Sequence, residues 1–585
     1  MSTPFKTLSQ ELAHEFAEAG ITDAFLVTGG AIAPLTTAIA EQGRIRMHFM
    51  LTEQSAGIAA EAYGYLDLKP ALLIVTSGPG VTNALTPVAA AWTNSSPMIV
   101  ISGQARSSDV ALSKNVSSRQ VGSQHLRTDK LVESIVKLFI EIEEPRNSKT
   151  VVSALKDAAI NGRPGPVWLS IPQDIQRGPR SSESLKLEIP LQEAESGAID
   201  FEKLVIDYLS KCKSPAILVG AGSRNSFSEI LSFAEHFRIP ILTTWSAIDL
   251  LPDDHPLYCG RPGSIPSSWV PNYINVETDF LLIFGVRLDL GQVGYNPSQF
   301  ALKANVVRID IDELEFSRIS SRENWHNICA DINSLTESLS RLKQLDITPE
   351  VVDWWGKIDE WKKFSPRPNN LSKEFEDGVS SYEMISHASD LFKNSLVVTG
   401  SSGTCMEMVL QAWAVKKGQR IINSCGLGSM GFAVAAAIGV STKVNSAELL
   451  CIESDGSLSM NLQDLTTMAT MNSVFKLIVM DSSGYKSIQL SQKRSGQSEH
   501  GHDFDTGLIL PDLHVIGEAV GFKVQLAKKN SELISKLTWL KSCKTSAMLI
   551  VKVSSKEEAL PRLISRPNEK GIMETPPMDD LWPKV

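Results

Sequence analysis

The sequence lacks paired cysteines, a long apolar run and an excess of positive charge. Its seven cysteines form no C-x-x-C pair and are odd in number, which argues against a disulfide framework or a structural zinc site and favours the reducing cytoplasm. The longest nearly apolar stretch, residues 432–440, is too short to cross a bilayer, and the N-terminus lacks the basic start of a signal peptide. The net charge of −10 has no compensating basic cluster. We therefore expect a soluble cytoplasmic protein with no membrane or nucleic-acid partner.

The chain is long enough for several domains. Its 585 residues exceed the roughly 250–300 at which single hydrophobic cores stop growing. Short apolar runs alternate with helical patterns in three groups, and runs of this kind are typical of parallel strands buried on both faces. Polar segments separate the groups. The sequence predicts an α/β fold of three doubly wound parallel-sheet domains, over residues 1–180, 195–345 and 370–555, followed by a tail, 556–585, that is either ordered or a lid.

The candidate functional residues follow the apolar runs, because ligands of such sheets bind beyond the carboxyl ends of the strands. Gly78 and Pro79, in TSGPG, offer backbone N–H groups at a helix start, although a tight turn without a ligand has the same pattern. Glu53 begins a helix of small residues directly after the run MHFML. It is either a simple partner of the helix dipole or a buried carboxylate able to exchange a proton with a heterocycle.

Two further turns have the chemistry of a metal site. Asp455, Gly456 and Ser457 follow the run LLCIE, and Ser482 and Gly484 follow the run KLIVMD. A strand, a helix and a second strand fit between these turns, so both would lie at one sheet edge. There a carboxylate, a hydroxyl and a carbonyl oxygen would hold a divalent ion against a diphosphate. Two ordinary surface turns are the alternative.

Taken together, these segments resemble the thiamine-diphosphate enzymes of the acetolactate synthase and pyruvate decarboxylase superfamily over nearly the whole chain. The resemblance is carried by Glu53 with its helix, TSGPGVTNALTPVAAAW, GRPGPVWLSIP, NSCGLGSMGFAVAAAIG and ESDGSLSMNLQDL followed by DSSGY.

The resemblance assigns the cofactor contacts. Glu53 would bond N1′ of the aminopyrimidine, the Gly428 carbonyl would accept from its 4′-amino group, and Met430 would enforce the bent cofactor conformation. Asp455, Ser482 and the Gly484 carbonyl would hold Mg²⁺. The remaining cofactor-binding residues implied by the resemblance are Gly78, Pro79, Gly403, Gly456 and Ser457.

The middle domain resembles the flavin-binding domain of the acetolactate synthases, through VGAG, CGRPG, GVRLD and RIDID. Gly222, Arg287 and Asp310 are the candidates to contact FAD, which would be structural. Gln124, in RQVGSQHL, would face the reaction centre. Its neighbour His125 is either a proton shuttle or, as is more common for a lone His in a polar loop, merely solvated.

The resemblance implies decarboxylation of a 2-oxo acid, with pyruvate favoured, and ligation of the acyl unit to a carbonyl acceptor. The acceptor is either a second 2-oxo acid or a keto-sugar nucleotide of a modified-sugar pathway. It also implies a homodimer or homotetramer with active sites between chains. The alternatives are a simple 2-oxo acid decarboxylase and a catalytically silent cofactor-binding scaffold, since Ser482 replaces the family's usual Asn with a weaker ligand. A nicotinamide dehydrogenase is disfavoured because VGAGSRN lacks the third glycine of G-x-G-x-x-G.

Overall fold

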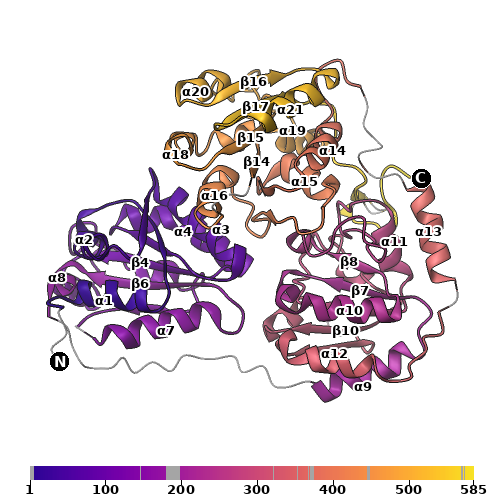
Figure 1. Ribbon diagram of the computed structural model, residues 1–585, viewed down its shortest axis with the longest axis horizontal. Helices are drawn as coiled ribbons and strands as arrows, with labels where there is room; N and C mark the ends of the chain where they lie inside the picture. Colours follow the sequence, from indigo (N-terminus) through magenta and orange to yellow (C-terminus); the bar gives the residue numbers. More distant parts are fainter. Residues whose placement is uncertain are drawn as a thin grey trace.

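The computed structural model describes residues 5–144, 146–179, 198–319, 322–351, 353–365, 368, 374–444, 448–567, 569, 571 and 573–584. These residues form three parallel β-sheets flanked by helices (Figure 1). The predicted fold class is therefore confirmed. Among the described helices, none is both long and apolar enough to cross a membrane.

The first unit is a six-stranded parallel sheet of order β2-β1-β3-β4-β6-β5. Its strands are β1 (Asp23–Leu26), β2 (Arg46–Phe49), β3 (Leu72–Val75), β4 (Met98–Gln104), β5 (Phe139–Glu141) and β6 (Pro166–Pro172). Its helices are α1 (Leu8–Glu18), η1 (Gly30–Ile32), α2 (Ala33–Gln42), α3 (Glu53–Asp67), α4 (Pro79–Asn94), α5 (Ser107–Ser113), α6 (Thr128–Val132), α7 (Ser148–Ile160) and α8 (Gln173–Arg177). The central strands β3, β4 and β6 are buried at every residue, which explains why their sequences are apolar runs without alternation.

The second unit is a five-stranded parallel sheet of order β11-β10-β9-β7-β8. Its strands are β7 (Pro215–Val219), β8 (Ile241–Thr243), β9 (Phe280–Phe284), β10 (Asn305–Asp310) and β11 (Trp325–Cys329). Its helices are α9 (Ala198–Leu209), η2 (Ala221–Ser226), α10 (Phe227–Phe237), η3 (Trp245–Ala247), α11 (Val270–Glu277), η4 (Pro297–Gln299), η5 (Glu313–Arg318), η6 (Ile332–Leu335), α12 (Thr336–Leu342) and α13 (Trp354–Phe364). Helix α13 lies in a segment that the sequence marks only as a connection. It is anchored by Trp354, whose buried indole N–H donates to the Pro215 carbonyl at 3.0 Å.

The third unit is a six-stranded parallel sheet of order β13-β12-β14-β15-β17-β16. Its strands are β12 (Leu396–Thr399), β13 (Ile421–Ile422), β14 (Leu449–Ser454), β15 (Phe475–Asp481), β16 (Lys523–Ala527) and β17 (Ala547–Lys552). Its helices are α14 (Ser381–Leu391), α15 (Gly403–Ala412), α16 (Phe432–Ser441), α17 (Asp455–Leu458), α18 (Asp464–Thr470), α19 (Lys486–Arg494), α20 (Leu513–Ala519), η8 (Asn530–Glu532) and α21 (Leu533–Ser542). The first predicted metal-site turn lies in α17, directly after β14, and only α18 and β15 lie between it and the second turn. The first of the two expected strands therefore precedes the interval, and β14 and β15 are neighbours in the sheet.

The first and third units pack through α3 and α16, which lie side by side in Figure 1. Every residue of α16 is buried, and one hydrophobic cluster includes residues of both helices. A Cβ atom at Gly439 would lie 2.1 Å from the Ala59 carbonyl oxygen, so only glycine permits this approach of the two backbones. The apolar stretch that is too short for a membrane therefore forms the helix between two units.

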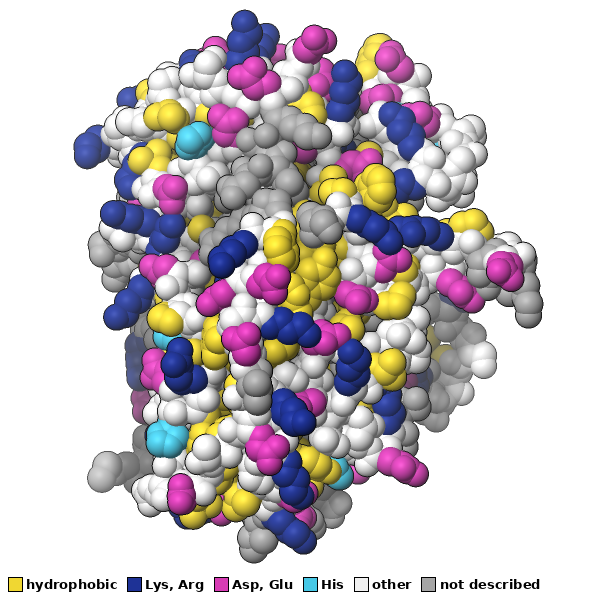
Figure 2. Space-filling view, turned by 90° about the vertical axis from the view of Figure 1, so that its right-hand side faces the viewer, with side chains coloured by type: hydrophobic (Ala, Val, Ile, Leu, Met, Phe, Trp, Pro, Cys, Tyr) yellow, Lys and Arg dark blue, Asp and Glu magenta, His cyan; other side chains and the backbone are white. Residues whose placement is uncertain are grey.

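The described part of the C-terminal tail is ordered against the second unit. It contains a short antiparallel ribbon of β18 (Arg566–Pro567) and β19 (Met573–Glu574). Met578 is buried there, and its carbonyl oxygen accepts from Asn272 Nδ2 at 2.7 Å. The chain end lies beside α11 and α13 in Figure 1. On the face in Figure 2, acidic and basic side chains are interspersed.

Candidate functional site

Glu53 lies at the start of α3, where the fold leaves backbone N–H groups without helical partners. The helix begins after Thr52, whose hydroxyl oxygen accepts a hydrogen bond from the Ser55 N–H. The Glu53 side chain is half-buried, and its Oε2 accepts from Asn83 Nδ2 of α4 at 3.0 Å. One Glu53 oxygen is thus held while the other remains available to a ligand.

Gln124 lies against the Gly78 turn in a conformation that few non-glycine residues adopt. Its φ is +56°, and a Cβ atom at Gly78, which itself has φ +61°, would lie 2.9 Å from the Gln124 Cβ. Ser77 Oγ donates to Gln124 Oε1 at 3.3 Å, and the Gln124 side-chain N–H groups donate to no other described residue. Pro79 begins α4 directly after this turn. A Cβ atom at Gly80 would lie 3.6 Å from Glu53 Oε1, so Glu53 and the Gly78 turn are neighbours. Glu53, Gly78, Pro79 and Gln124 form what we call the pyrimidine-side cluster.

The expectation that His125 is solvated is wrong. Only 4% of the residue is exposed, and burial lowers the pKa of its imidazole. A neutral buried ring is therefore favoured over a solvated imidazolium.

Asp455, Ser482 and Gly484 converge at the carboxyl ends of β14 and β15. Ser482 Oγ lies 3.4 Å from Asp455 Oδ1 and donates to the Gly484 carbonyl at 3.0 Å, while the Gly484 N–H donates to Asp455 Oδ2 at 2.8 Å. No side chain fits at Gly484, because a Cβ atom there would lie 1.9 Å from the His502 carbonyl oxygen. The turn geometry thus brings three oxygen donors of different type together, which is the donor chemistry that Mg²⁺ prefers.

The charge balance around Asp455 also fits a bound cation. The residue is 3% exposed, and burial together with the charge of Asp481 raises the pKa of its carboxyl. Among the described residues, no ion pair offsets this charge. The described residues contain no group of three or more His, Cys, Asp or Glu side chains that could hold a metal ion, so a metal at Asp455 would depend on hydroxyl and carbonyl oxygens as well.

The remaining third-unit candidates surround the same turns. Gly403 begins α15 with φ +67°, and Gly428 has φ +74° beside the Ser401 carbonyl. Met430 is half-buried two residues further on. Ser457 Oγ accepts from the Gly431 N–H at 2.8 Å and so ties this loop to α17, which contains Gly456. We call these residues, with Asp455, Ser482 and Gly484, the diphosphate-side cluster.

Within one chain, no hydrogen bond between described residues joins the pyrimidine-side cluster to the diphosphate-side cluster. The two are connected through the packing of α3 on α16. A site completed by a second chain, as the resemblance implies, stays a prediction.

The three flavin candidates lie at one edge of the second sheet. Gly222 follows β7 and packs against Gly285, which follows β9; Asp310 ends β10. Burial raises the pKa of the Asp310 carboxyl to about 6. Arg287 already donates from Nη1 to the Thr93 carbonyl of the first unit at 2.5 Å. Arg287 therefore has a structural partner whether or not a flavin binds.

Glu61 and Asp464 are buried acids that no sequence motif indicates. Glu61 and Asp464 are 2% and 0% exposed, and burial raises the pKa of each carboxyl to about 7. Asp464 Oδ2 accepts from Ser55 Oγ of α3 at 2.7 Å. For Glu61, the sequence signal is a charged residue within the otherwise largely apolar sequence AGIAAEAYGYL, but the sequence alone does not show which residues its side chain faces.

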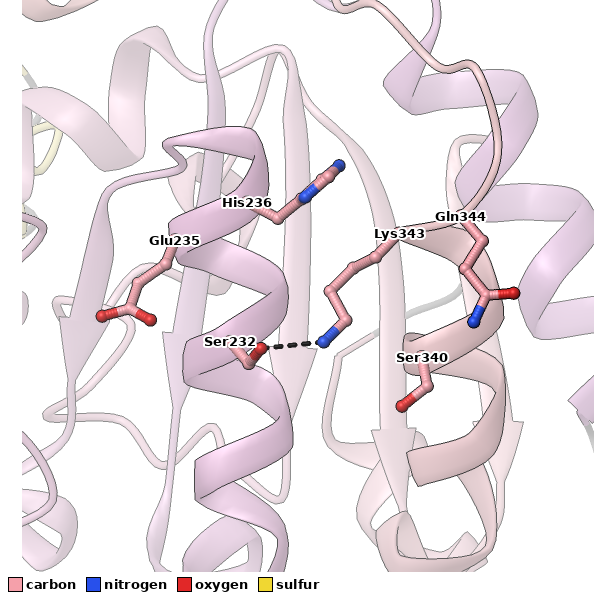
Figure 3. A pocket seen from close by; sticks show the side chains of 6 residues that line it. All are labelled: Ser232, Glu235, His236, Ser340, Lys343 and Gln344. Atoms are coloured by element: carbon pink, nitrogen blue, oxygen red, sulfur yellow. Dashed lines mark hydrogen bonds between the residues drawn. The ribbon is translucent and has the colours of Figure 1, made fainter.

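An open groove of about 590 Å³ lies away from both clusters, between α10 and α12 (Figure 3). Lys343 Nζ reaches across it and donates to Ser232 Oγ at 2.8 Å. Its lining is formed by Ser232, Glu235, His236, Ser340, Lys343 and Gln344. None of the predicted site residues lies in this groove.

Comparison with known proteins identifies the class of this protein. Residues 6–129 match the N-terminal TPP binding domain of thiamine pyrophosphate enzymes, residues 203–341 match the central domain, and residues 401–551 match the C-terminal TPP binding domain. The chain belongs to the thiamine pyrophosphate enzymes. The pyrimidine-side cluster lies within the matched N-terminal domain, and the diphosphate-side cluster lies within the matched C-terminal domain.

Among individual proteins, the chain is similar to acetolactate synthase large subunits. It is 28% identical to the acetolactate synthase isozyme 1 large subunit of Escherichia coli (strain K12), over 81% of this chain and 81% of that protein. It is 27% identical to the acetolactate synthase large subunit of Buchnera aphidicola subsp. Schizaphis graminum, over 88% and 89%. It is also 27% identical to acetolactate synthase 2, chloroplastic, of Zea mays, over 95% and 87%.

Proposed function

We propose that this enzyme decarboxylates a 2-oxo acid, with pyruvate favoured, and ligates the acyl unit to a carbonyl acceptor. The convergence of Asp455, Ser482 and Gly484 into a set of oxygen donors carries the proposal, because it equips the third unit to hold Mg²⁺ on a diphosphate. The acetolactate synthase relatives support the reaction type. The acceptor is a second 2-oxo acid or a keto-sugar nucleotide.

Thiamine diphosphate, when bound, supplies a thiazolium that acts as the electron sink for decarboxylation. Glu53 would hold a proton at N1′ of the aminopyrimidine through Oε1, because Oε2 accepts from Asn83. The Gly428 carbonyl and Met430 would orient the pyrimidine. Asp455 would neutralise part of the Mg²⁺ charge, and Ser482 and Gly484 would complete its protein ligands.

Gln124 would polarise the substrate carbonyl. Its carbonyl end accepts from Ser77, so its N–H groups are the end that donates to a substrate oxygen. The resemblance implies that Ser123 stands where Phe is common, and this smaller side chain would enlarge or polarise the pocket, which is compatible with an acceptor bulkier than pyruvate.

We further propose that Gly222, Arg287 and Asp310 contact a structural FAD. The protein would act as a homodimer or homotetramer in which the pyrimidine-side cluster of one chain meets the diphosphate-side cluster of another. Light scattering of the active protein tests the assembly, and an active monomer would contradict it.

The test of the reaction is carbon dioxide release from pyruvate by purified protein with thiamine diphosphate and Mg²⁺, with products identified by mass spectrometry for each acceptor class. We expect release and a ligated product. Glu133→Gln, which changes a carboxylate whose side chain is 68% exposed, is the matched control for a Glu53→Gln variant in this assay and should release carbon dioxide as the unmodified protein does. Aldehyde as the sole product would favour a simple decarboxylase. No release from any 2-oxo acid, despite cofactor binding, would refute the proposed reaction and favour a silent scaffold.

A further inference from the structure

Glu61 is a buried acid at the junction of the first and third units. It lies on α3, two turns beyond Glu53, and is 2% exposed. Its Oε1 accepts from Asn94 Nδ2 of α4 at 2.7 Å and from Ser424 Oγ at 2.8 Å. Ser424 follows β13 in the third unit, so one carboxyl oxygen joins three segments that are far apart in the sequence.

Asn94 extends this contact into the glycine-rich loop that follows Ser424. Its Oδ1 accepts from the Gly426 N–H at 3.2 Å. A Cβ atom at Gly426 would lie 2.7 Å from the same Asn94 oxygen, so the loop approaches α4 as closely as a glycine allows. Side chains of the first unit therefore hold the loop at two places, Glu61 at Ser424 and Asn94 at Gly426.

The same loop contains the cofactor-facing candidates. Two residues after Gly426 comes Gly428, whose N–H donates to the Ser424 carbonyl at 3.2 Å, and Met430 follows. The loop then joins α17 through the bond from the Gly431 N–H to Ser457 Oγ. A shift at Ser424 would thus be transmitted to Gly428 and Met430.

We propose that Glu61, acting with Asn94, is a positioning residue that fixes the loop of residues 424–430 for thiamine diphosphate. This inference rests on the proposed function and adds to it a residue that does not touch the cofactor. Its chemistry requires acceptance of two hydrogen bonds at Oε1, and it does not require a negative charge. The other oxygen, Oε2, has no hydrogen-bond partner among the described residues. The hydrogen bonds of the Glu61 carboxyl group are therefore those that Oε1 accepts from Asn94 and Ser424.

The test is a titration of the full-length apoprotein with thiamine diphosphate and Mg²⁺, in which tryptophan fluorescence reports equilibrium binding. Glu61→Leu gives an apolar side chain of similar size that lacks the acceptor oxygen. We expect the dissociation constant to rise about 10- to 100-fold, the range seen when groups that orient direct ligands are removed. Glu61→Gln retains an acceptor oxygen and should restore binding to that of the unmodified protein.

Two further variants separate positioning from general damage. Ser96→Ala removes a buried bond, from Ser96 Oγ to the Glu61 backbone carbonyl at 2.7 Å, that involves neither the Glu61 side chain nor the loop of residues 424–430. It should leave cofactor affinity unchanged. Asn94→Ala removes the Gly426 contact and should weaken binding as Glu61→Leu does, and the double variant should lose little more than either single variant.

The outcomes distinguish the two proposals. Unmodified protein that does not bind thiamine diphosphate would overturn the proposed function and this inference with it. Normal binding by Glu61→Leu, an equal loss in Ser96→Ala, or a failure of Glu61→Gln to restore affinity would overturn this inference alone. If Glu61→Leu does not fold, Asn94→Ala compared with Ser96→Ala decides in the same way.

Discussion

Replacing Asp249 with alanine should loosen the junction of all three units. The Asp249 side chain is 0% exposed and bonds two arginines, with Arg224 Nη2 donating at 2.6 Å and Arg420 Nε donating at 2.7 Å. The N–H of Ile421, the first residue of β13, donates to the same carboxylate at 3.2 Å. Arg420 also donates from Nη1 to the Leu66 carbonyl at the end of α3. The Asp249 carboxylate of the second unit thus holds Arg420, which contacts the first unit and directly precedes the edge strand β13 of the third unit.

The magnitude follows from burial. Removing one partner of a buried ion pair typically costs about 3–5 kcal/mol, because the remaining charge is left without a partner. The arginine side chains are 18% and 28% exposed and recover part of their hydration, which favours the lower end. About 3 kcal/mol corresponds to roughly a hundredfold change in the opening equilibrium.

Native-state hydrogen exchange followed by mass spectrometry is the assay, because a chain of several units does not unfold in one step. Amides of β13 should exchange roughly a hundredfold faster in Asp249→Ala, given the energy above. Asp207→Ala, which removes a carboxylate whose side chain is 53% exposed, is the control and should change protection by less than about 1 kcal/mol.

The pH dependence provides a second check. Burial alone would raise the pKa of the Asp249 carboxyl, but the charges of Arg224 and Arg420 outweigh burial and lower it. A lowered folded-state pKa means that the stabilisation is present above the ordinary value of 3.8 and is lost as the pH falls through the folded value. The difference between the two proteins should therefore be constant near neutrality and shrink only in acid. A β13 protection change below about 1 kcal/mol at neutral pH would refute the reasoning.

Three other perturbations have defined outcomes. Gly439→Ala places a Cβ atom 2.1 Å from the Ala59 carbonyl oxygen, so native-state hydrogen exchange should show the protection of α16 amides falling by about 1–3 kcal/mol or more, and unchanged protection would contradict the packing of α3 on α16. Asp455→Ala should abolish the dependence of thiamine diphosphate binding on Mg²⁺, measured by titration with and without a chelator; retained dependence would mean that the metal binds elsewhere. Glu53→Gln should lower turnover by about 10²–10⁴-fold while cofactor affinity is retained, and undiminished turnover would exclude Glu53 from proton transfer.

The parallel strands were predictable because their burial on both faces leaves a direct mark on the sequence. The central runs at residues 72–75, 98–101 and 449–452 are apolar at every position and lie in β3, β4 and β14. Edge strands have one covered side and a weaker signal, and β16, with the pattern KVQLA, was not recognised. Helix α13 was not predictable for a similar reason, because its tryptophans and lysines do not show which face of the helix is buried.

The pairing of Asp455 with Ser482 was also predictable, because a strand, a helix and a neighbouring strand must return the chain to the same sheet edge. The burial of His125 was not, since polar neighbours in the sequence say nothing of what packs over the ring. The cofactor roles of these residues, the flavin contacts and the domain boundaries remain predictions.

By itself, the sequence determined the fold class and the short-range geometry, since apolar periodicity, glycine-rich turns and strand ends depend on residues close together in the chain. Only the tertiary structure decided which turns face one another across hundreds of residues. It placed Glu61 and Asn94 against Ser424, Asp249 between two arginines, and the tail on the second unit. These contacts arise from the packing of α3 on α16 and of the units on one another, and a contact between distant segments leaves no period or spacing in a single sequence.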